Sequence, residues 1–381
     1  MDLRDGVIFF AGKTEGEKMV KLTNDFFKQN FHEIPFILYG AGINGVFCNQ
    51  YMKKLSMENN IIYYVDSNSE KHGKYLCEKE IKKPSSIKDN PEAIIIISCS
   101  AYKEIHLMLR AWGCLNPIYA YLTLEPHIHD EPFIFDSGLL ESYYSANDAS
   151  SKAMIKIVSF VRNEENSKIQ AIDDVEELVT CYHYWPPEWK EDISTLSSHI
   201  TLCDGGAFDG DTFRQLYKDY GDNLKKYYGF EPSLDLFQKL EGCVKSHHFQ
   251  EKSSIYRAGL GAKKEVLSFV SDDFIPMKGS FSSKENLNAK ENIIPLDSLN
   301  IDVIGELCIK MDIEGFELQA LEGARQTIKK YKPKLAICVY HRTNDILHVP
   351  EFIKSIDSDY ECVLRGGTHM VCYASNMKTS I

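Results

Sequence analysis

The sequence predicts an α/β fold made of two doubly wound, Rossmann-like domains. Two stretches alternate apolar strands with helices, and in each a glycine-rich turn separates a strand from the helix that follows it. Continuous apolar strands alternating with helices are typical of a parallel sheet covered on both faces. The last two strands of the second stretch are separated only by residues 366–369, too short for a helical crossover. They therefore predict an antiparallel hairpin at the sheet edge.

The chain of 381 residues is long for one core, so two domains are expected. We predict a Rossmann-like domain at residues 1–125, a helical bridge at 126–195 and a second α/β domain at 196–381. Residues 1–33 look helical and polar, which predicts a cap on the first domain. The strands expected in the first domain are residues 34–39, 61–65 and 93–98.

The bridge breaks the alternation. It contains a predicted helix at residues 152–162, an acidic helix at 169–180 and an aromatic, proline-containing loop at 182–189. The loop either packs between the domains, since aromatic side chains dominate buried contacts, or forms a wall of an acceptor pocket. The strands expected after the bridge are residues 200–204, 226–231, 254–258, 307–312, 334–340, 360–365 and 370–374, with an extra hairpin strand at 265–271.

Composition excludes several classes of protein. A formal net charge of −12 argues against broad nucleic-acid binding, which needs a cationic surface. Wholly apolar stretches such as residues 93–97 are too short to span a bilayer, and no segment resembling a signal peptide opens the chain. The eleven cysteines are odd in number and scattered, without a CxxC pair. We therefore expect a cytoplasmic protein without a disulfide framework.

Three strands of the second domain end in acidic or glycine residues. The first ends at Asp204 and continues into Gly205 and Gly206; two others end at Glu231 and Asp312. Open α/β sheets bind ligands at this carboxyl edge, where a carboxylate can pair with ribose hydroxyls and glycine admits a ligand close to the backbone. Asp204 could also face the ammonium group of a methionine moiety. Strand-end acids also cap helices, but the three ends together predict a site for S-adenosylmethionine (SAM).

These residues resemble the FkbM-type family of class I SAM-dependent methyltransferases, over roughly residues 180–375. The motifs that carry the resemblance are Asp-Gly-Gly-Ala-Phe-Asp-Gly-Asp-Thr at 204–212, Phe-Glu-Pro at 230–232, Ile-Pro-Leu-Asp-Ser-Leu at 294–299, Lys-Met-Asp-Ile-Glu-Gly-Phe-Glu at 310–317, Leu-Glu-Gly at 321–323 and Tyr-His at 340–341. The second domain is thereby expected to have the class I methyltransferase sheet.

The resemblance also implies a set of cofactor-binding residues. They are Asp204, Gly205, Gly206, Gly210, Thr212, Glu231 and Asp312, the last beside the transferred methyl group. Two positions depart from the family pattern. Phe208 stands where many relatives have asparagine, and the third strand ends in Ala258-Gly259, without an acid to bind adenine.

Methyl transfer to a hydroxyl needs a base for the proton. His341 and Asp312, which follow the fifth and fourth strands, are the candidate catalytic residues. Asp312, Glu314, Glu317 and His341 could alternatively hold a divalent metal ion, although acidic residues here also suit a helix start. Arg365 could bind an anionic part of the acceptor or pair with a surface carboxylate.

The first domain carries a second glycine motif. Gly40, Gly42 and Gly45 follow a strand and open a helix, and Asp66 comes 21 residues after Gly45. This is the context of a dinucleotide fingerprint. The segment is similar to the small Rossmann-like units attached to sugar-modifying enzymes, which leaves either a nucleotide or nucleotide-sugar ligand or a purely structural role.

The sequence thus predicts a SAM-dependent O-methyltransferase, and the family resemblance implies a sugar, glycan or other small-molecule hydroxyl as its acceptor. One alternative is an NAD-dependent sugar-modifying oxidoreductase or epimerase that works through the first domain. Another is a non-catalytic nucleotide-binding protein. We expect no nucleic-acid partner and no membrane span, whereas an oligomer is compatible with the sequence.

Overall fold

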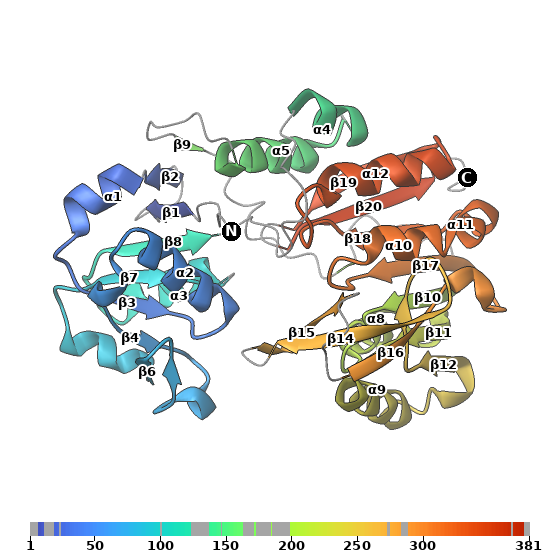
Figure 1. Cartoon of the computed structure of the whole chain (residues 1–381), viewed down its shortest axis with the longest axis horizontal. Coiled ribbons are helices and arrows are strands. Elements are labelled where there is room, and N and C mark those ends of the chain that lie inside the picture. Colours follow the sequence, from blue (N-terminus) through green and yellow to red (C-terminus); the bar gives the residue numbers. More distant parts are fainter. Residues whose placement is uncertain are drawn as a thin grey trace. The chain divides into compact units, whose positions relative to one another are not determined.

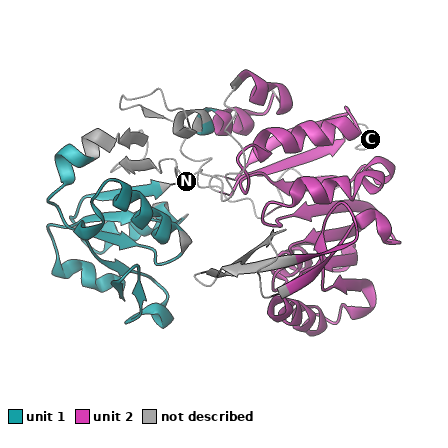
Figure 2. Cartoon of the chain, in the orientation of Figure 1, with its two compact units in different colours: residues 1–125, 156–180 teal, residues 126–155, 181–381 magenta. Residues whose placement is uncertain are grey.

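The computed structural model describes residues 7–10, 19–22, 24–99, 101–122, 137–145, 147–162, 171–172, 184, 199–272, 275–282, 289–366 and 369–376. The chain divides into two compact units (Figure 2). Unit 1 contains residues 1–125 and 156–180, and unit 2 contains residues 126–155 and 181–381. The stretch predicted as a separate bridge is thus divided between the two units.

Unit 1 is built on a sheet with the strand order β5-β6-β4-β3-β7-β8-β1-β2-β9 (Figure 1). Strands β6, β4, β3, β7 and β8 run parallel, and every residue of β3 and β7 is buried, which confirms the predicted parallel core. The bounds are β3 Phe36–Tyr39, α2 Ile43–Lys54, β4 Ile61–Val65, β5 Tyr75–Leu76, β6 Lys79–Lys82, β7 Ile94–Ile97, α3 Tyr102–Ala111 and β8 Ile118–Leu122.

The start of unit 1 differs from the prediction of a helical cap. Strands β1 (Val7–Phe10) and β2 (Met19–Leu22) precede α1 (Asn24–Phe31), and β1 pairs antiparallel with β8. The prediction was wrong over these strands because their partner lies more than a hundred residues away in the sequence, and local polarity carries no record of such pairing.

The predicted bridge contains α4 (Ser137–Tyr143) and α5 (Ala149–Arg162). Helix α5 confirms the helix expected at 152–162. Within the expected acidic helix at 169–180, the structure instead has β9 (Ala171–Ile172), which pairs with β2. The rest of that helix, and the aromatic loop apart from Tyr184, lie outside the described residues.

Unit 2 is built on a seven-stranded sheet with the order β12-β11-β10-β17-β18-β20-β19. The first five strands in this order are parallel, while β20 and β19 are antiparallel, so the edge hairpin is confirmed. The bounds are β10 Ile200–Gly205, β11 Leu224–Phe230, β12 Ser253–Tyr256, β17 Glu306–Met311, β18 Lys334–Cys338, β19 Tyr360–Arg365 and β20 Val371–Asn376. The helices between them are α8 Asp211–Tyr220, α9 Leu234–Ser246, α10 Glu317–Glu322, α11 Arg325–Tyr331 and α12 Asp345–Ile356.

A second, four-stranded sheet in unit 2 has the order β13-β16-β14-β15. It contains the extra hairpin strand expected near residues 265–271, which is β14 (Glu265–Asp272). Its partners are β13 (Gly259–Leu260), β15 (Ile275–Ser282) and β16 (Ala289–Ile294). This sheet takes the place of a helical connection between β12 and β17.

The outer strand β19 is covered by Tyr144, Ser145, Asp148 and Ser151. Tyr144 forms a parallel bridge with Cys362, and the Ser145 amide donates to the Cys362 carbonyl at 2.8 Å. The Arg365 guanidinium donates to both oxygens of Asp148, at 2.5 and 2.6 Å. Of the two roles open to Arg365, pairing with a carboxylate is the one observed.

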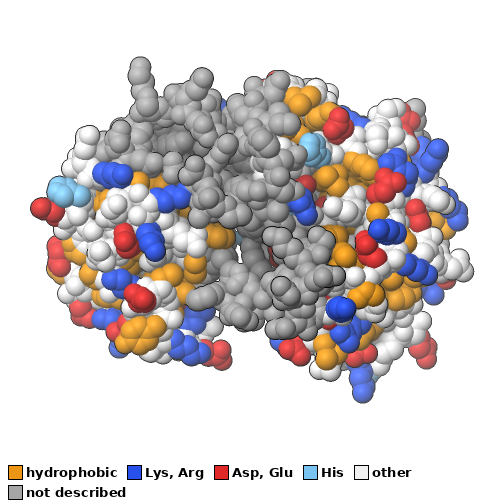
Figure 3. Space-filling view, in the orientation of Figure 1, with side chains coloured by type: hydrophobic (Ala, Val, Ile, Leu, Met, Phe, Trp, Pro, Cys, Tyr) orange, Lys and Arg blue, Asp and Glu red, His pale blue; other side chains and the backbone are white. Residues whose placement is uncertain are grey.

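Among the described residues, no helix combines the length and apolar character that crossing a membrane requires. Acidic and basic side chains are mixed on the described part of each unit that Figure 3 shows. The described surface in this view therefore has no broad basic patch, in agreement with the net negative charge of the chain.

Candidate functional site

The carboxyl edge of the seven-stranded sheet brings the three predicted strand ends together. β10 lies between β11 and β17, so the chain that leaves β10 has a neighbouring strand end on each side. The Gly206 amide donates to the Phe230 carbonyl at 3.0 Å, and the Asp312 amide donates to the Gly205 carbonyl at 3.1 Å. From β10 the chain continues to β11 and β12 on one side and later to β17 and β18 on the other, so the strand order reverses at β10. Open α/β sheets bind ligands at the carboxyl edge of such a reversal.

The turn after β10 depends on glycine. Gly206 has φ +70°, and a Cβ there would lie 1.9 Å from the Asp312 carbonyl oxygen. Gly210, at the start of α8, has φ +90°, and its Cβ would lie 2.8 Å from Cys243 Sγ. Phe208 also has a positive φ of 50°, and Thr212 is buried in the first turn of α8. The turn is thus fixed against β17 on one side and α9 on the other.

Glu231 is joined to the same turn. Its carboxylate accepts the Phe208 amide at 3.0 Å and the Ser233 amide at 2.9 Å. The side chain is buried, and burial raises the pKa of this carboxyl to about 7. An ionised carboxylate has about four acceptor sites, and these amides occupy two. The remaining two are what a pair of ribose hydroxyls needs.

Asp204 lies beneath the turn, fully buried. Its carboxylate is 3.1 Å from Lys310 Nζ and accepts the Tyr227 hydroxyl at 3.0 Å. Burial raises the pKa of Asp204 to about 6 despite the nearby lysine. Lys310 Nζ also donates to the Gly206 carbonyl at 2.6 Å. Asp204 therefore stabilises the turn through Lys310. The positive group that its carboxylate faces in the structure is this lysine, whereas the sequence suggested the ammonium group of a ligand.

Replacing Lys310 with methionine should destabilise the protein by about 3–5 kcal/mol, because Asp204 would lose its counter-charge in a fully buried position. Lys226→Met is the matched control, since the Asp302 side chain that it pairs with is 66% exposed; such surface pairs contribute less than about 1 kcal/mol. Thermal unfolding of both variants measures the difference. Equal losses would contradict the inferred role of Lys310.

Asp312, at the end of β17, is the centre of a second group of polar contacts. It accepts the hydroxyls of Tyr340, at 3.0 Å, and of Tyr184. His341 Nε2 lies 3.2 Å from Asp312 Oδ1 and 3.5 Å from Glu314 Oε2. His341 Nδ1 lies 2.8 Å from Glu317 Oε1. The two candidate catalytic residues, Asp312 and His341, are thus in direct contact.

The members of this group differ in exposure. The side chains of His341 and Glu317 are fully buried, whereas that of Asp312 is 20% exposed. Burial opposes charge here, but contact with His341 holds the pKa of Asp312 well below its usual range. Burial likewise opposes protonation of His341, but the neighbouring Glu317 and Asp312 carboxylates raise its pKa well above the ordinary value. Asp312 and Glu314, whose side chain is 28% exposed, are therefore the members that a ligand can contact.

Comparison with known proteins bears on this site. Residues 204–360 match the family model of the methyltransferase FkbM domain. Unit 2 carries an FkbM methyltransferase domain. The match begins at Asp204 and includes every residue predicted to bind SAM, so the resemblance read from the sequence is confirmed. No curated protein gives a significant match to the chain.

One solved structure supports the fold of the chain. The crystal structure of methyltransferase FkbM from Methylobacillus flagellatus KT is similar over 92% of both chains, with 19% identity and a TM-score of 0.58. UDP-D-quinovosamine 4-dehydrogenase from Vibrio fischeri is similar over 23% of this chain and 76% of its own, with 18% identity and a TM-score of 0.19. Precorrin-6y C5,15-methyltransferase from Geobacter metallireducens GS-15 is similar over 52% and 93%, with 12% identity and a TM-score of 0.30. The last two scores are too low to show a shared fold.

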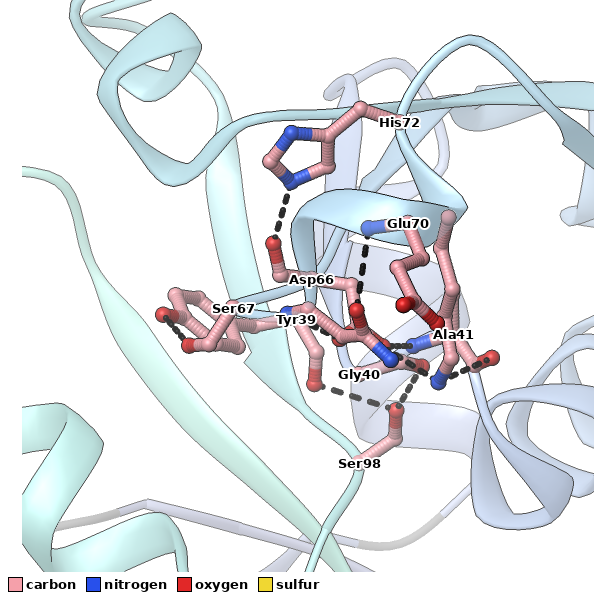
Figure 4. Close-up of polar contacts among 10 residues, drawn as sticks. Tyr39, Gly40, Ala41, Asp66, Ser67, Glu70, His72 and Ser98 are labelled. Carbon is pink, nitrogen blue, oxygen red and sulfur yellow. Dashed lines mark hydrogen bonds and ion pairs between the residues drawn. The ribbon is translucent and has the colours of Figure 1, made fainter.

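The glycine motif of unit 1 lies outside the FkbM domain and is largely satisfied by its own surroundings (Figure 4). Asp66 accepts the Ala41 amide at 2.9 Å, the Asn68 amide at 2.8 Å and Lys71 Nζ at 2.9 Å. Gly40 has φ +115°, and a Cβ at Gly45 would lie 2.3 Å from the Gly40 carbonyl oxygen, whereas one at Gly42 would meet no atom within 4 Å. Packing thus explains two of the three glycines and the acid. The comparisons give no support for a nucleotide-sugar here.

The sequence did not identify two residues at the carboxyl edge of the seven-stranded sheet, Lys310 and Tyr184. Lys310 belongs to a predicted motif and Tyr184 to a predicted loop, but neither was predicted as a site residue. In the structure, Lys310 Nζ lies 4.7 Å from the centre of the Tyr184 ring. An apolar strand that contains one lysine two positions before a terminal acid is the signal for Lys310, because a buried lysine needs a carboxylate partner. No local signal marks Tyr184, whose partner Asp312 is 128 residues away.

Proposed function

We propose that the FkbM domain transfers the methyl group of SAM to a hydroxyl oxygen of a sugar, glycan or other small molecule. The bond from sulfur to the methyl carbon breaks, a bond from that carbon to oxygen forms, and the hydroxyl proton leaves to a base. S-adenosylhomocysteine and a methyl ether are the products. Because the sulfonium already activates the methyl group, the chain has mainly to align the acceptor with it.

The observation that carries this proposal is the hydrogen bond between the Glu231 carboxylate and the backbone of the glycine turn. A buried carboxylate with acceptor sites to spare lies hydrogen-bonded to the turn at Phe208. Close beside it, Gly206 keeps the backbone bare of side chain. A ribose with two hydroxyls fits the first feature, and the methionine part of SAM can approach the backbone of a turn that begins with glycine. Asp204, Gly205, Gly210 and Thr212 then complete or support the cofactor site.

The acceptor is proposed to lie beside Asp312. Its carboxylate is the partly exposed member of the pair that it forms with His341, so it can contact a hydroxyl group directly. His341, fully buried behind it, would act through Asp312. Tyr184 donates to the same carboxylate. It belongs to the aromatic loop at residues 182–189, one interpretation of which is a wall of the acceptor pocket. The sugar class rests on the family resemblance, and the absence of disulfides among the ten described cysteines suits the proposed cytoplasmic location.

Calorimetric titration of the full-length protein with S-adenosylhomocysteine, with NAD as the comparison ligand, tests the proposal. Micromolar binding of S-adenosylhomocysteine alone is the expected result, and it would justify a screen of sugar acceptors with radiolabelled SAM. Binding of NAD alone would favour the alternative of an oxidoreductase working through unit 1. Binding of neither would contradict the proposed cofactor.

A further inference from the structure

Three side chains from different elements of unit 2, those of Asp312, Glu317 and His341, lie close together. Asp312 follows β17, Glu317 is the first residue of α10, and His341 follows β18. Each offers one donor atom, a carboxylate oxygen or a ring nitrogen, and these atoms all lie within 4.8 Å of one another. Glu317 and His341 are fully buried, while the Asp312 side chain is partly exposed to solvent. The group is therefore enclosed by protein on one side and accessible on the other.

Glu317 has a carboxylate oxygen that its surroundings leave unsatisfied. Its Oε1 accepts the Ile313 amide at 2.9 Å and faces His341 Nδ1 at 2.8 Å. Its Oε2 is buried without a hydrogen-bond partner among the described residues. Buried polar atoms almost always have a partner, and an exception points to a water or an ion. This oxygen is an observation separate from the clustering of the acids.

The charges around the group point to a cation. Glu314 Oε2 lies 3.5 Å from His341 Nε2, and the buried Asp345 accepts the Arg342 amide at 3.2 Å behind it. The nearby Lys310 is matched by Asp204. Three carboxylates, those of Asp312, Glu314 and Glu317, therefore lie within 3.5 Å of a single imidazole ring, that of His341. An excess of buried carboxylate is costly unless a positive charge offsets it.

We propose that Asp312, Glu317 and His341 bind one divalent transition-metal ion, with Glu314 near enough to assist. A donor set of one imidazole and two carboxylates suits Mn²⁺, Fe²⁺ or Zn²⁺ better than Mg²⁺ or Ca²⁺, which prefer oxygen alone. The site does not depend on methyl transfer. If the proposed function also holds, the ion would lie next to the acceptor hydroxyl and favour loss of its proton.

The test uses full-length protein treated with a chelator and then titrated with MnCl₂ or ZnCl₂ in a calorimeter, without SAM or acceptor. One ion per chain should bind with micromolar affinity or better, and Mg²⁺ at least tenfold more weakly. Glu317→Gln and His341→Gln should each weaken Mn²⁺ binding at least tenfold. Glu322→Gln is the control, because Glu322 is 49% exposed and pairs with Arg325; its Mn²⁺ affinity should equal that of the parent.

Circular dichroism identifies any variant that fails to fold, and Asp312→Asn, at the partly exposed ligand, then replaces it in the comparison. The proposal is overturned if the parent protein binds neither Mn²⁺ nor Zn²⁺. It is also overturned if the folded variants bind as tightly as the parent, which would place the ion elsewhere. Because no SAM is present, these outcomes are independent of whether S-adenosylhomocysteine binds.

Discussion

Gly206→Ala is expected to destabilise the FkbM domain by about 4 kcal/mol or more, an exceptional loss for a single methyl group. The new Cβ would lie 1.9 Å from the Asp312 carbonyl oxygen, which belongs to the backbone and cannot rotate away. Alanine also disfavours the φ of +70° at this position. Calorimetric melting of the variant measures the loss, and titration with S-adenosylhomocysteine should show that binding is abolished.

Gly242→Ala is the matched control for this change. Gly242 lies within α9, where a Cβ would meet no atom within 4 Å, and alanine favours a helix over glycine by up to about 1 kcal/mol. The control should therefore melt at or slightly above the temperature of the parent. A Gly206→Ala protein that melts with the parent would show that the turn and the end of β17 do not approach each other as described.

Glu231→Ala should weaken the binding of S-adenosylhomocysteine by about 100-fold. Two hydrogen bonds from ribose hydroxyls to a charged acceptor contribute roughly 3 kcal/mol together, which corresponds to two orders of magnitude in affinity. The Phe208 and Ser233 amides would lose their acceptor as well. Glu241→Ala, at an exposed position of α9, is the control and should bind as the parent does. Unchanged binding in the Glu231 variant would remove the ribose from this position.

The same residue predicts how affinity changes with pH. Burial raises the pKa of Glu231 to about 7, so the carboxylate needed for the ribose forms as the pH rises through that value. Affinity should therefore increase up to about pH 8 and then level off, and Glu231→Gln should remove this dependence. Stability should change in the opposite direction. A raised folded-state pKa favours the protonated carboxyl, so this stabilising contribution is complete below pH 4.5 and lost as the pH approaches 7, by roughly 3 kcal/mol.

The parallel strands and the edge hairpin could be predicted because their signal is local. β3 and β7 are continuous apolar runs, and a four-residue connection can join only antiparallel neighbours. The strands β1 and β2 could not be predicted, because β1 pairs with the distant β8 and β2 pairs with β1 and the distant β9. Local pattern thus specified the strands whose signal lies in their own residues, but not those that depend on distant partners.

The candidate site divides in the same way. Gly206 and Glu231 were found because strand ends and glycine turns leave a mark in the sequence. The partners that define the remaining residues come from other elements: Lys310 of β17 for Asp204, and Glu317 of α10 for His341. Which acid would pair with which base depends on the packing of β10, β17 and β18, so the sequence could name the charged residues without assigning their contacts.

The segment that covers β19 has a consequence for how the FkbM domain can be isolated. Tyr144, Ser145 and Ser151 occupy hydrogen-bonding groups of the outermost strand, and such strands otherwise recruit strands from other molecules. The family match, residues 204–360, contains neither this cover nor β20. A chain trimmed to those limits would expose β18, whose five residues are all buried, as an unprotected margin prone to aggregation. Residues 126–155 thus belong to the same compact unit, although they precede the family match in the sequence.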